Sequence, residues 1–463
     1  MTRSKNSDFH IVMFPWFAVG HMTPFLHLAN KLAGKGYEIT LILPKKAVKQ
    51  LESLNLHPDL ITLHPLTVPS VDGLPAGAET ASDVPLSLSG LLAIAMDRTR
   101  GQVEGVIHAT RPKLVMYDSA HWVPEITRKL GIKTICYNVV CAAAIAIVLV
   151  PARNIRKDQP VTEEEVAVPP PGYPSSVVAL RRHEAPSLLF VSLPYGEGIT
   201  FYDRITTAMK NCDAISIRTC LEIEEKFCNY IGSQYRKPVI LTGPVLPEPA
   251  KTLLEDRWSK WFAGYEPGSV VFCAFGSQFI LEKNQFQELL LGFELTGLPF
   301  LVAVKPPIGA STIEEALPEG FEKRVKGRGV AWGGWVQQPM ILAHPSVGCF
   351  VSHCGFGSMW EALMSDCQIV LVPQLGDQIL NTRLLVEDLN VAVEVEKEEN
   401  GWFSKESVSR SILSVMEKNS EKGKSLRENH MKCRDMLCST GFMDGYIDRF
   451  IQSMHELCQV NNQ

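Results

Sequence analysis

The stretch "GCFVSHCGFGSMWEAL", residues 348–363, decides the fold of the second half of the chain. A buried-strand pattern ends at His353, and a helical pattern begins near Ser358 after several small residues. Glycines let a ligand approach the backbone closely, and free N–H groups at a helix start attract anions. The stretch therefore predicts a phosphate-binding site at the end of a strand. The alternative is a tight turn that binds no ligand. A metal site is disfavoured, because His353 and Cys354 have no second ligand pair at suitable spacing.

The same alternation of short strands and helices runs outward through the chain. Strand patterns occupy residues 10–16, 37–44, 113–118, 133–138, 269–277, 299–304, 329–335, 348–353, 368–373 and 391–395. Helical patterns fill the gaps; in the first, Thr23 is placed as an N-cap and Pro24 as the first helical residue. Such alternation predicts an α/β protein with two Rossmann-like, doubly wound parallel-sheet domains facing a cleft. Ligands bind at the carboxyl ends of the strands in these folds.

The domain boundaries follow from composition. The segment "LTGPVLPEPAK", which begins at Leu241, is rich in proline and is a candidate linker. We predict an N-terminal α/β domain over residues 1–243, a linker over 244–252, a C-terminal α/β domain over 253–440, and a last helix over 441–463 that packs back on the first domain. Residues 151–202 are expected to form loops and short helices that shape a pocket.

Bulk properties exclude several classes of protein. The chain has 463 residues, of which 46% are hydrophobic and 21% charged, and its net charge of -5 gives no basic footprint for nucleic acid. The 12 cysteines form no C-x-x-C pair, and the start of the chain lacks the pattern of a secretory signal. The longest apolar run, residues 139–150, is too short to cross a bilayer. We expect a cytoplasmic, monomeric enzyme without a transmembrane segment.

The segment from Trp335 to Gln378 extends the opening stretch on both sides. It contains a W-x-x-Q start, then H-P-S-x-G-x-F, H-C-G, S-x-x-x-E and a closing D-Q. This segment resembles the donor-binding signature of the plant secondary-product UDP-glycosyltransferases of glycosyltransferase family 1. The likeness runs from the "G-H" loop at Gly20 to the C-terminal helix, and it implies a fold of the GT-B type.

The resemblance implies a role for each matching position. Trp335 would stack on uracil and the Val336 backbone would read the base edge, since an indole suits a planar π-face. Gln338 and Glu361 would hold the ribose hydroxyls. The remaining implied donor contacts are His353, Ser358, Ser277, Gly20 and the backbone near Gly355 and Gly357 for the pyrophosphate, and Asp377 and Gln378 for the sugar.

One part of the signature departs from the common form. The family usually has H-C-G-W-N-S, whereas this chain has "HCGFGS" with Phe356 and Gly357. Gly357 removes an amide that could donate to phosphate, a bond worth ~1.5–3 kcal/mol with a charged acceptor. The variant resembles the branch that adds a sugar to a sugar already on the acceptor, and it leaves glucose, rhamnose and xylose open as donors.

A candidate base lies near the N-terminus. His21 follows the first strand and directly precedes a helix, whose N-terminus disfavours the imidazolium ion, so His21 is expected to be able to accept a proton. Asp118 ends another strand at the same sheet edge and could fix the tautomer of His21. Local sequence alone also allows a capping or core histidine and a turn aspartate, with His121 as another partner. The resemblance implies that His21 is the base and Asp118 its partner.

Other residues near the expected cleft are weaker candidates. We predict acceptor contacts from Trp16, Phe17, Trp122, Tyr137 and Asn138, although aromatic side chains pack in cores by default. His183 and Glu184 are interpreted as a charge cluster on a surface loop.

The resemblance and the candidate base together favour an inverting UDP-glycosyltransferase. The resemblance alone implies that the first domain binds the acceptor, a flavonoid or other phenolic glycoside, and that the second binds the UDP-sugar. The predicted partners are a UDP-sugar donor and a small-molecule glycoside acceptor. Neither a cofactor nor a metal is predicted, since no D-x-D pair occurs. The alternatives are an aglycone O-glucosyltransferase and a non-catalytic nucleotide-sugar binding protein. A serine hydrolase and a dehydrogenase are disfavoured, because G-x-S-x-G and an early G-x-G-x-x-G are both missing from the sequence.

Overall fold

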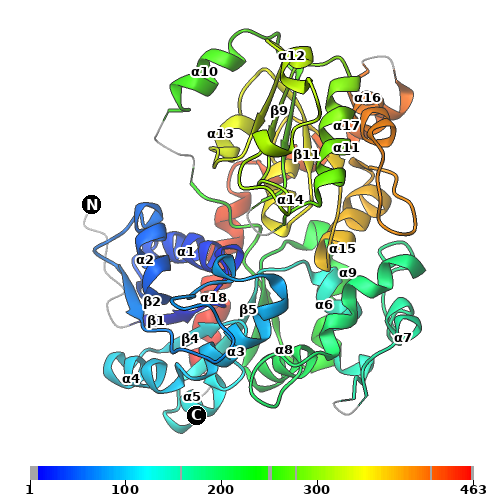
Figure 1. Ribbon diagram of the computed structural model, residues 1–463. Helices are drawn as coiled ribbons and strands as arrows, with labels where there is room; N and C mark the ends of the chain where they lie inside the picture. Colours follow the sequence, from blue (N-terminus) through cyan, green and yellow to red (C-terminus); the bar gives the residue numbers. More distant parts are fainter. Residues whose placement is uncertain (1–8, 157–158, 249–252, 277–278, 418–419, 460–463) are drawn as a thin grey trace. The chain divides into compact units, whose positions relative to one another are not determined.

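A computed structural model describes residues 9–156, 159–248, 253–276, 279–417 and 420–459 (Figure 1). The chain divides into two compact units, neither of which is continuous in sequence. The first unit comprises Met1–Pro174, Ala185–Pro247 and Gly441–Gln463, and the second comprises Ser175–Glu184 and Glu248–Thr440. Ser175–Glu184 groups with the second unit although it lies in the N-terminal half of the sequence.

The described part of the first unit contains a seven-stranded, all-parallel sheet with the order β3-β2-β1-β4-β5-β6-β7. Its strands are β1 (His10–Phe14), β2 (Glu38–Pro44), β3 (Ile61–Leu66), β4 (Leu114–Tyr117), β5 (Lys133–Asn138), β6 (Ala214–Ile217) and β7 (Val239–Leu241). The order reverses between β1 and β4, where Phe14 lies beside Tyr117 in register. This reversal is the switch point at which doubly wound sheets bind ligands.

Helices cover both faces of this sheet. The α-helices in the described part of this unit are α1 (Val19–Gly34), α2 (Lys45–Leu51), α3 (Ser89–Asp97), α4 (Arg100–Thr110), α5 (Val123–Lys129), α6 (Ala142–Val148), α7 (Glu163–Ala167), α8 (Phe201–Asn211), α9 (Leu221–Tyr235) and α18 (Phe442–Gln459). One buried cluster joins apolar residues of α1, α2 and the strands to Ile447, Phe450 and Met454 of α18, the red helix in Figure 1. On the other face, the Tyr117 hydroxyl donates to the Ala208 carbonyl of α8 (2.8 Å).

The described part of the second unit contains a six-stranded, all-parallel sheet with the order β10-β9-β8-β11-β12-β13. Its strands are β8 (Val270–Ala274), β9 (Phe300–Ala303), β10 (Gly329–Trp332), β11 (Val347–Ser352), β12 (Gln368–Leu371) and β13 (Ala392–Glu394). The order reverses between β8 and β11, where Ala274 pairs with Ser352.

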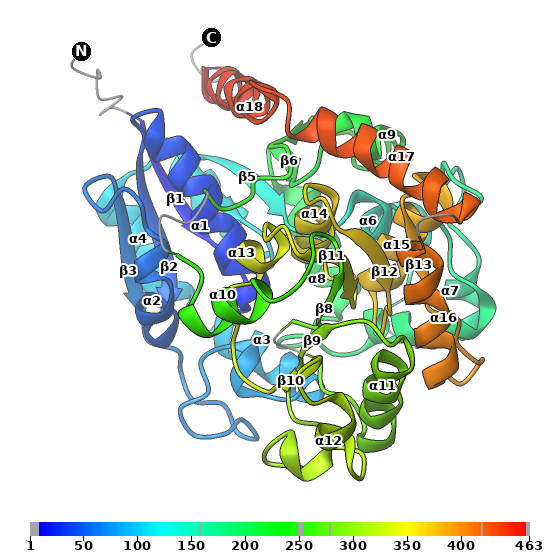
Figure 2. The ribbon, with the colours of Figure 1, turned by 90° about the horizontal axis from the view of Figure 1, so that it is seen from above.

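The helices of the second unit are α10 (Asp256–Phe262), α11 (Lys283–Leu295), α12 (Phe321–Val325), α13 (Gln338–Leu342), α14 (Phe356–Leu363), α15 (Asp377–Arg383), α16 (Lys405–Met416) and α17 (Glu421–Leu437). Helices α11 and α16 pack together beside the sheet (Figure 2) and share a buried apolar cluster with β8, β9, β11 and β12. The predicted fold class, α/β with two doubly wound parallel sheets, is confirmed.

The predicted elements differ from the observed ones in detail. Every predicted strand is present, whereas the short strands β3, β6 and β7 were missed. Helix α1 begins at Val19, so Thr23 is not its N-cap and Pro24 lies inside the helix. The Ala18 carbonyl accepts from both the His21 and Met22 N–H groups (2.9 Å each), which starts the helix without a side-chain cap.

Candidate active site

The candidate base lies at the switch point of the first sheet. His21 is in the first turn of α1, which follows β1, and Asp118 comes directly after β4. The His21 Nδ1 atom lies 2.5 Å from Asp118 Oδ2. Residues that are 97 positions apart in sequence are thus brought together by the pairing of β1 with β4.

The surroundings of Asp118 fix the orientation of its carboxylate. The Trp16 and Ser119 N–H groups both donate to Oδ1, at 2.7 and 2.5 Å. Oδ2 is left to face His21, whose side chain is 28% exposed while that of Asp118 is 6% exposed. A carboxylate accepts but does not donate, so Nδ1 of His21 carries the proton and Nε2 presents its lone pair. The arrangement can therefore accept a proton at Nε2.

The opening stretch lies at the switch point of the second sheet. His353 follows β11 directly, and its ring packs against Gly276 and Gly355 so closely that a Cβ on Gly355 would lie 2.6 Å from His353 Nε2. Burial lowers the pKa of His353 to about 4, opposed in part by a hydrogen bond with the Ala274 backbone. The imidazole is therefore neutral at pH 7. Ser277, the other predicted phosphate contact at this edge, lies outside the described residues.

The turn from β11 into α14 is tightly defined. Cys354 has φ +62°, a left-handed conformation that costs a non-glycine residue about 1 kcal/mol or more. It is held by Asn381, whose side-chain amide donates to the Cys354 carbonyl (2.8 Å). Helix α14 then begins at Phe356, after Gly355 as the N-cap. The N–H groups of its first turn point out of the helix end and can bind an anion.

The residues expected to hold a nucleoside form a connected group. The Gln338 side-chain amide donates to Glu361 Oε2 (2.5 Å) and to Ser358 Oγ (3.3 Å). These residues belong to α13 and α14, so two short helices place an amide, a carboxylate and a hydroxyl together. The Trp335 side chain is 76% exposed, so its ring is accessible. Val336 is buried, and its carbonyl accepts from the Gln338 N–H (2.9 Å).

The expected sugar contacts begin α15, which follows β12. Asp377 is the first residue of the helix, and Gln378 is the second. Gln378 Oε1 accepts from the Gln374 and Leu375 N–H groups at 3.0 and 3.2 Å, which leaves its amide N–H groups to donate elsewhere. Gly376, the N-cap, has φ 50° and ψ -120°, a conformation that favours glycine.

All five predicted acceptor residues are buried. Phe17 and Tyr137 are 0% exposed, and Tyr137 belongs to the main apolar cluster of the first unit. Asn138 is buried, and its amide donates to the Cys136 and Ser216 carbonyls at 3.2 Å each. Trp16 is also buried, beside the Tyr195 ring. Their roles in acceptor binding stay predictions, and in this structure core packing accounts for Phe17, Tyr137 and Asn138.

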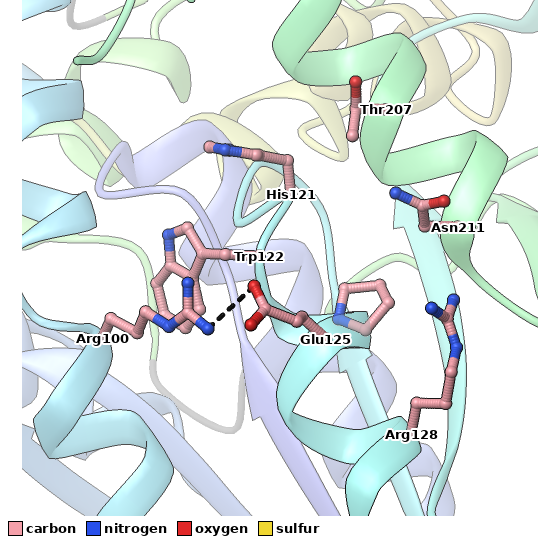
Figure 3. A pocket seen from close by; sticks show the side chains of 8 residues that line it. Arg100, His121, Trp122, Glu125, Arg128, Thr207 and Asn211 are labelled. Atoms are coloured by element: carbon pink, nitrogen blue, oxygen red, sulfur yellow. Dashed lines mark ion pairs between the residues drawn. The ribbon is translucent and has the colours of Figure 1, made fainter. Parts of the chain in front are cut away.

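Trp122 and His121 line a pocket of about 290 Å³ in the first unit (Figure 3). The pocket lies between α4, α5 and α8, and its other lining residues are Arg100, Pro124, Glu125, Arg128, Thr207 and Asn211. Arg100 pairs with Glu125 (2.9 Å), and the Trp122 indole donates to Asp97 (2.9 Å). Since neither His21 nor Asp118 lines this pocket, it is distinct from the candidate base.

Sequence reasoning missed a group of buried charges next to α15. Glu184 was expected in a surface loop, but its side chain is only 10% exposed and bonds to Arg383 of α15, so that interpretation was wrong. The partner lies 199 positions away, and no local pattern could have indicated it. Among the described residues, no group of three or more His, Cys, Asp or Glu could hold a metal ion, and no helix is long and apolar enough to span a membrane.

Comparisons with known proteins identify the family of this chain. The model of the family described as UDP-glucoronosyl and UDP-glucosyl transferase matches residues 327–436, which contain β11, α14 and α15. UDP-glycosyltransferase 79B6 of Arabidopsis thaliana is 60% identical, over 98% of this chain and 99% of its own. The chain belongs to the UDP-glycosyltransferase family. It is therefore a glycosyltransferase.

A further relative and a solved structure are also similar to this UDP-glycosyltransferase. Anthocyanidin 3-O-glucoside 2'''-O-xylosyltransferase of Arabidopsis thaliana is also 60% identical, over 98% of both chains. The structure of Glycyrrhiza uralensis UGT73P12, with glycyrrhetinic acid 3-O-monoglucuronide, superposes with a TM-score of 0.78 at 19% identity, covering 98% of this chain and 97% of that one. The fold is thus that of the plant UDP-glycosyltransferases. The predicted membership of glycosyltransferase family 1 is confirmed.

Proposed function

We propose that this UDP-glycosyltransferase inverts the anomeric centre as it moves glucose, rhamnose or xylose from a UDP-sugar to a hydroxyl of a small-molecule glycoside. A flavonoid or phenylpropanoid glucoside is the proposed acceptor class. The name of the anthocyanidin 3-O-glucoside xylosyltransferase, at 60% identity, supports a sugar-bearing acceptor. The observation that carries the proposal is the 2.5 Å contact between a part-exposed His21 and a buried Asp118.

Most of the proposed donor contacts belong to the second unit, and Gly20 of the first unit stays a proposed contact. Uracil would stack on the exposed Trp335 ring, and the ribose hydroxyls would bond to Gln338 and Glu361. The diphosphate would lie at the N-terminus of α14, where the backbone N–H groups of the first turn would donate to it. The Ser358 hydroxyl and the neutral His353 ring would add further hydrogen bonds. We propose no metal cofactor, since these donors can themselves stabilise the charge on the departing UDP.

The proposed chemistry at the first unit begins with His21. Nε2 would take the proton from the acceptor hydroxyl as its oxygen bonds to the anomeric carbon. Asp118 would stay ionised and stabilise the imidazolium, because its carboxylate is held by two backbone N–H groups and cannot turn away. The bond to UDP breaks on the opposite face of the sugar. An α-linked UDP-glucose would thus yield a β-glycoside.

A product screen tests this proposal. The purified protein is incubated with UDP-glucose, UDP-xylose or UDP-rhamnose and with flavonol 3-O-glucosides or their aglycones, and products are identified by mass. We expect one sugar to be added to the glucosides, with the new linkage of inverted configuration by NMR.

The same screen separates the alternatives. Products from aglycones alone would overturn the sugar-on-sugar assignment and favour an aglycone O-glucosyltransferase. UDP binding without transfer to any acceptor would instead favour a nucleotide-sugar binding protein. A product that retains the donor configuration would exclude the single displacement at His21.

A further inference from the structure

Four charged residues form a buried cluster against α15, which we call the α15 charge cluster: Glu184, Arg383, Glu394 and Lys397. The Arg383 side chain is 2% exposed, and those of Glu184 and Glu394 are each 10% exposed. The guanidinium of Arg383 donates to Glu184 Oε1 through one nitrogen and to Glu394 Oε2 (2.5 Å) through another. Each acid comes from a different segment, so the cluster joins α15 to β13 and to Ser175–Glu184.

The fourth member connects this cluster to a loop. The Lys397 ammonium group donates to the Pro373 carbonyl, which begins the loop of residues 373–376. The end of the loop is held by Gln378, whose Oε1 accepts from the N–H groups of Gln374 and Leu375. The loop is therefore fixed at its start by Lys397 and at its end by α15, and α15 is itself fixed by Arg383.

The charges in the cluster depend on one another. Burial lowers the pKa of Lys397 to about 8, while Glu394 and Glu184 act to raise it and Arg383 to lower it. Arg181 adds a partly exposed guanidinium 3.5 Å from Glu394. Two largely buried carboxylates are thus surrounded by the cations Arg383 and Lys397, with Arg181 at the exposed edge. Removing one member would leave an uncompensated charge in a poorly solvated place.

The position of the cluster argues for more than a general effect on stability. Helix α15 has seven residues and is about 10 Å long at about 1.5 Å per residue. Arg383 ends the helix that Asp377 and Gln378 begin. A shift at the charged end therefore moves the two residues proposed to contact the donor sugar. The Gln338–Glu361 pair lies on α13 and α14. Helix α15 contacts the turn before α14 through Asn381, so we expect a small effect on UDP binding and a larger one on UDP-sugar binding.

We propose that the α15 charge cluster positions the loop of residues 373–376 and the start of α15, so that Glu184 and Lys397 are positioning residues that determine selectivity among UDP-sugars. This inference rests on the proposed function and on the expectation that Asp377 and Gln378 contact the transferred sugar. It adds that residues 175–184, which lie in the N-terminal half of the sequence, are part of the donor-sugar site.

The test compares the binding of UDP with the binding of UDP-glucose and UDP-xylose by calorimetry, which needs no acceptor. In Lys397→Met and Glu184→Gln we expect the affinity for UDP to change less than about 2-fold and the affinity for the preferred UDP-sugar to fall by roughly 10-fold. The ratio of the affinity for UDP-glucose to the affinity for UDP-xylose should also change in these two variants. Glu396→Gln is the matched control, since Glu396 lies two residues after Glu394 and is exposed.

A pH series supplies the second measurement. Above about pH 8 Lys397 loses its proton, and the cluster loses one positive charge. The UDP-sugar affinity, divided by that for UDP, should therefore fall from pH 7 to pH 9 in the unmodified protein. The fall should be smaller in Lys397→Arg, whose guanidinium remains charged. Dividing by the UDP affinity cancels the titration of the uracil that both ligands share. The comparison with Lys397→Arg cancels the titration of the terminal phosphate of UDP, which UDP-sugars lack.

The outcomes separate this inference from the proposed function. Equal losses for UDP and UDP-sugars in both variants, or an unchanged ratio, would overturn the positioning role while leaving the transferase intact. A ratio with the same pH dependence in the unmodified protein and in Lys397→Arg would also overturn it, even if Lys397→Met and Glu184→Gln failed to fold. No binding of UDP by the unmodified protein would overturn the proposed function and this inference with it.

Discussion

The two sheets have the same kind of switch point but present different chemistry there. Between β1 and β4, the first sheet brings together one imidazole and one carboxylate from distant parts of the chain. Between β8 and β11, the second sheet presents a helix N-terminus, glycines and a neutral histidine, all from one short stretch. The same sheet topology can thus position either a proton acceptor or an anion-binding site, depending on which residues follow the strands.

The comparison predicts that changes at the first switch point affect chemistry and changes at the second affect donor binding. The sharpest test is His21→Ala. We expect the turnover rate to fall by about 10³-fold or more, because general-base catalysis contributes about 10²–10⁴-fold. The affinity for UDP should remain within about 2-fold of that of the unmodified protein, since the proposed UDP site uses no atom of His21.

Steady-state rates and calorimetry measure these two quantities. His108→Ala serves as the control, because His108 is exposed on α4. Transfer by His21→Ala at the unmodified rate would mean that another group is the base.

Asp118→Asn should have the next largest effect. The amide would still offer an oxygen to the Trp16 and Ser119 N–H groups, but it would place an NH₂ group toward His21 Nδ1. The ring would then need the opposite tautomer, with the proton on Nε2. We expect a fall in turnover of about 10²–10⁴-fold with little change in fold. Turnover by Asp118→Asn within about 3-fold of the unmodified enzyme would remove Asp118 from the mechanism.

Glu361→Gln tests the second switch point. The change removes a charged acceptor for the ribose hydroxyls and disturbs its bond to Gln338. We expect UDP affinity to fall by about 10–100-fold, as for the loss of a hydrogen bond of about 1.5–3 kcal/mol, with turnover at saturating donor nearly retained. Calorimetry with uridine and with UDP should show the same loss. A reduced turnover with unchanged UDP affinity would instead assign Glu361 to the chemical step.

The smallest expected effect concerns the two glycines at the start of α14. A Cβ on Gly357 meets nothing within 4 Å, so Gly357→Ala should raise the free energy of unfolding by about 0.5–1 kcal/mol. A Cβ on Gly355 would collide with His353, so Gly355→Ala should lower it and weaken UDP binding. Denaturant titration measures both changes. Equal stability of the two variants would contradict the close packing of His353 on Gly355.

Much of the donor side could be predicted from sequence because its residues are local. Trp335, Gln338, His353 and Glu361 lie within one segment, and strand–turn–helix patterns place them at one sheet edge. Predicting the His21–Asp118 pair required a further step of inference, since only the pairing of β1 with β4 brings Asp118 to His21. That step succeeded because the carboxyl ends of parallel strands share an edge.

The errors also have physical causes. The start of α1 was placed at Thr23, because Thr-Pro is a common helix start. The helix instead begins at Val19, and it forms without the backbone hydrogen bond that Pro24, which has no N–H group, cannot donate. Tyr137 follows the pattern of a strand end, yet its ring packs inward on Phe25. Glu184 seemed to be a loop charge, because its partner Arg383 is contributed by a distant helix.

The interrupted course of the second unit limits how this enzyme can be recombined with its relatives. A chimera that exchanged only the part of the chain after residue 247 would separate Arg383 from the Glu184 of its own parent. A mismatch at that position would leave a guanidinium without its carboxylate, a defect that costs about 3–5 kcal/mol when the pair is buried. In a hybrid enzyme, Ser175–Glu184 and the C-terminal half should therefore come from the same parent, because both segments belong to the second unit.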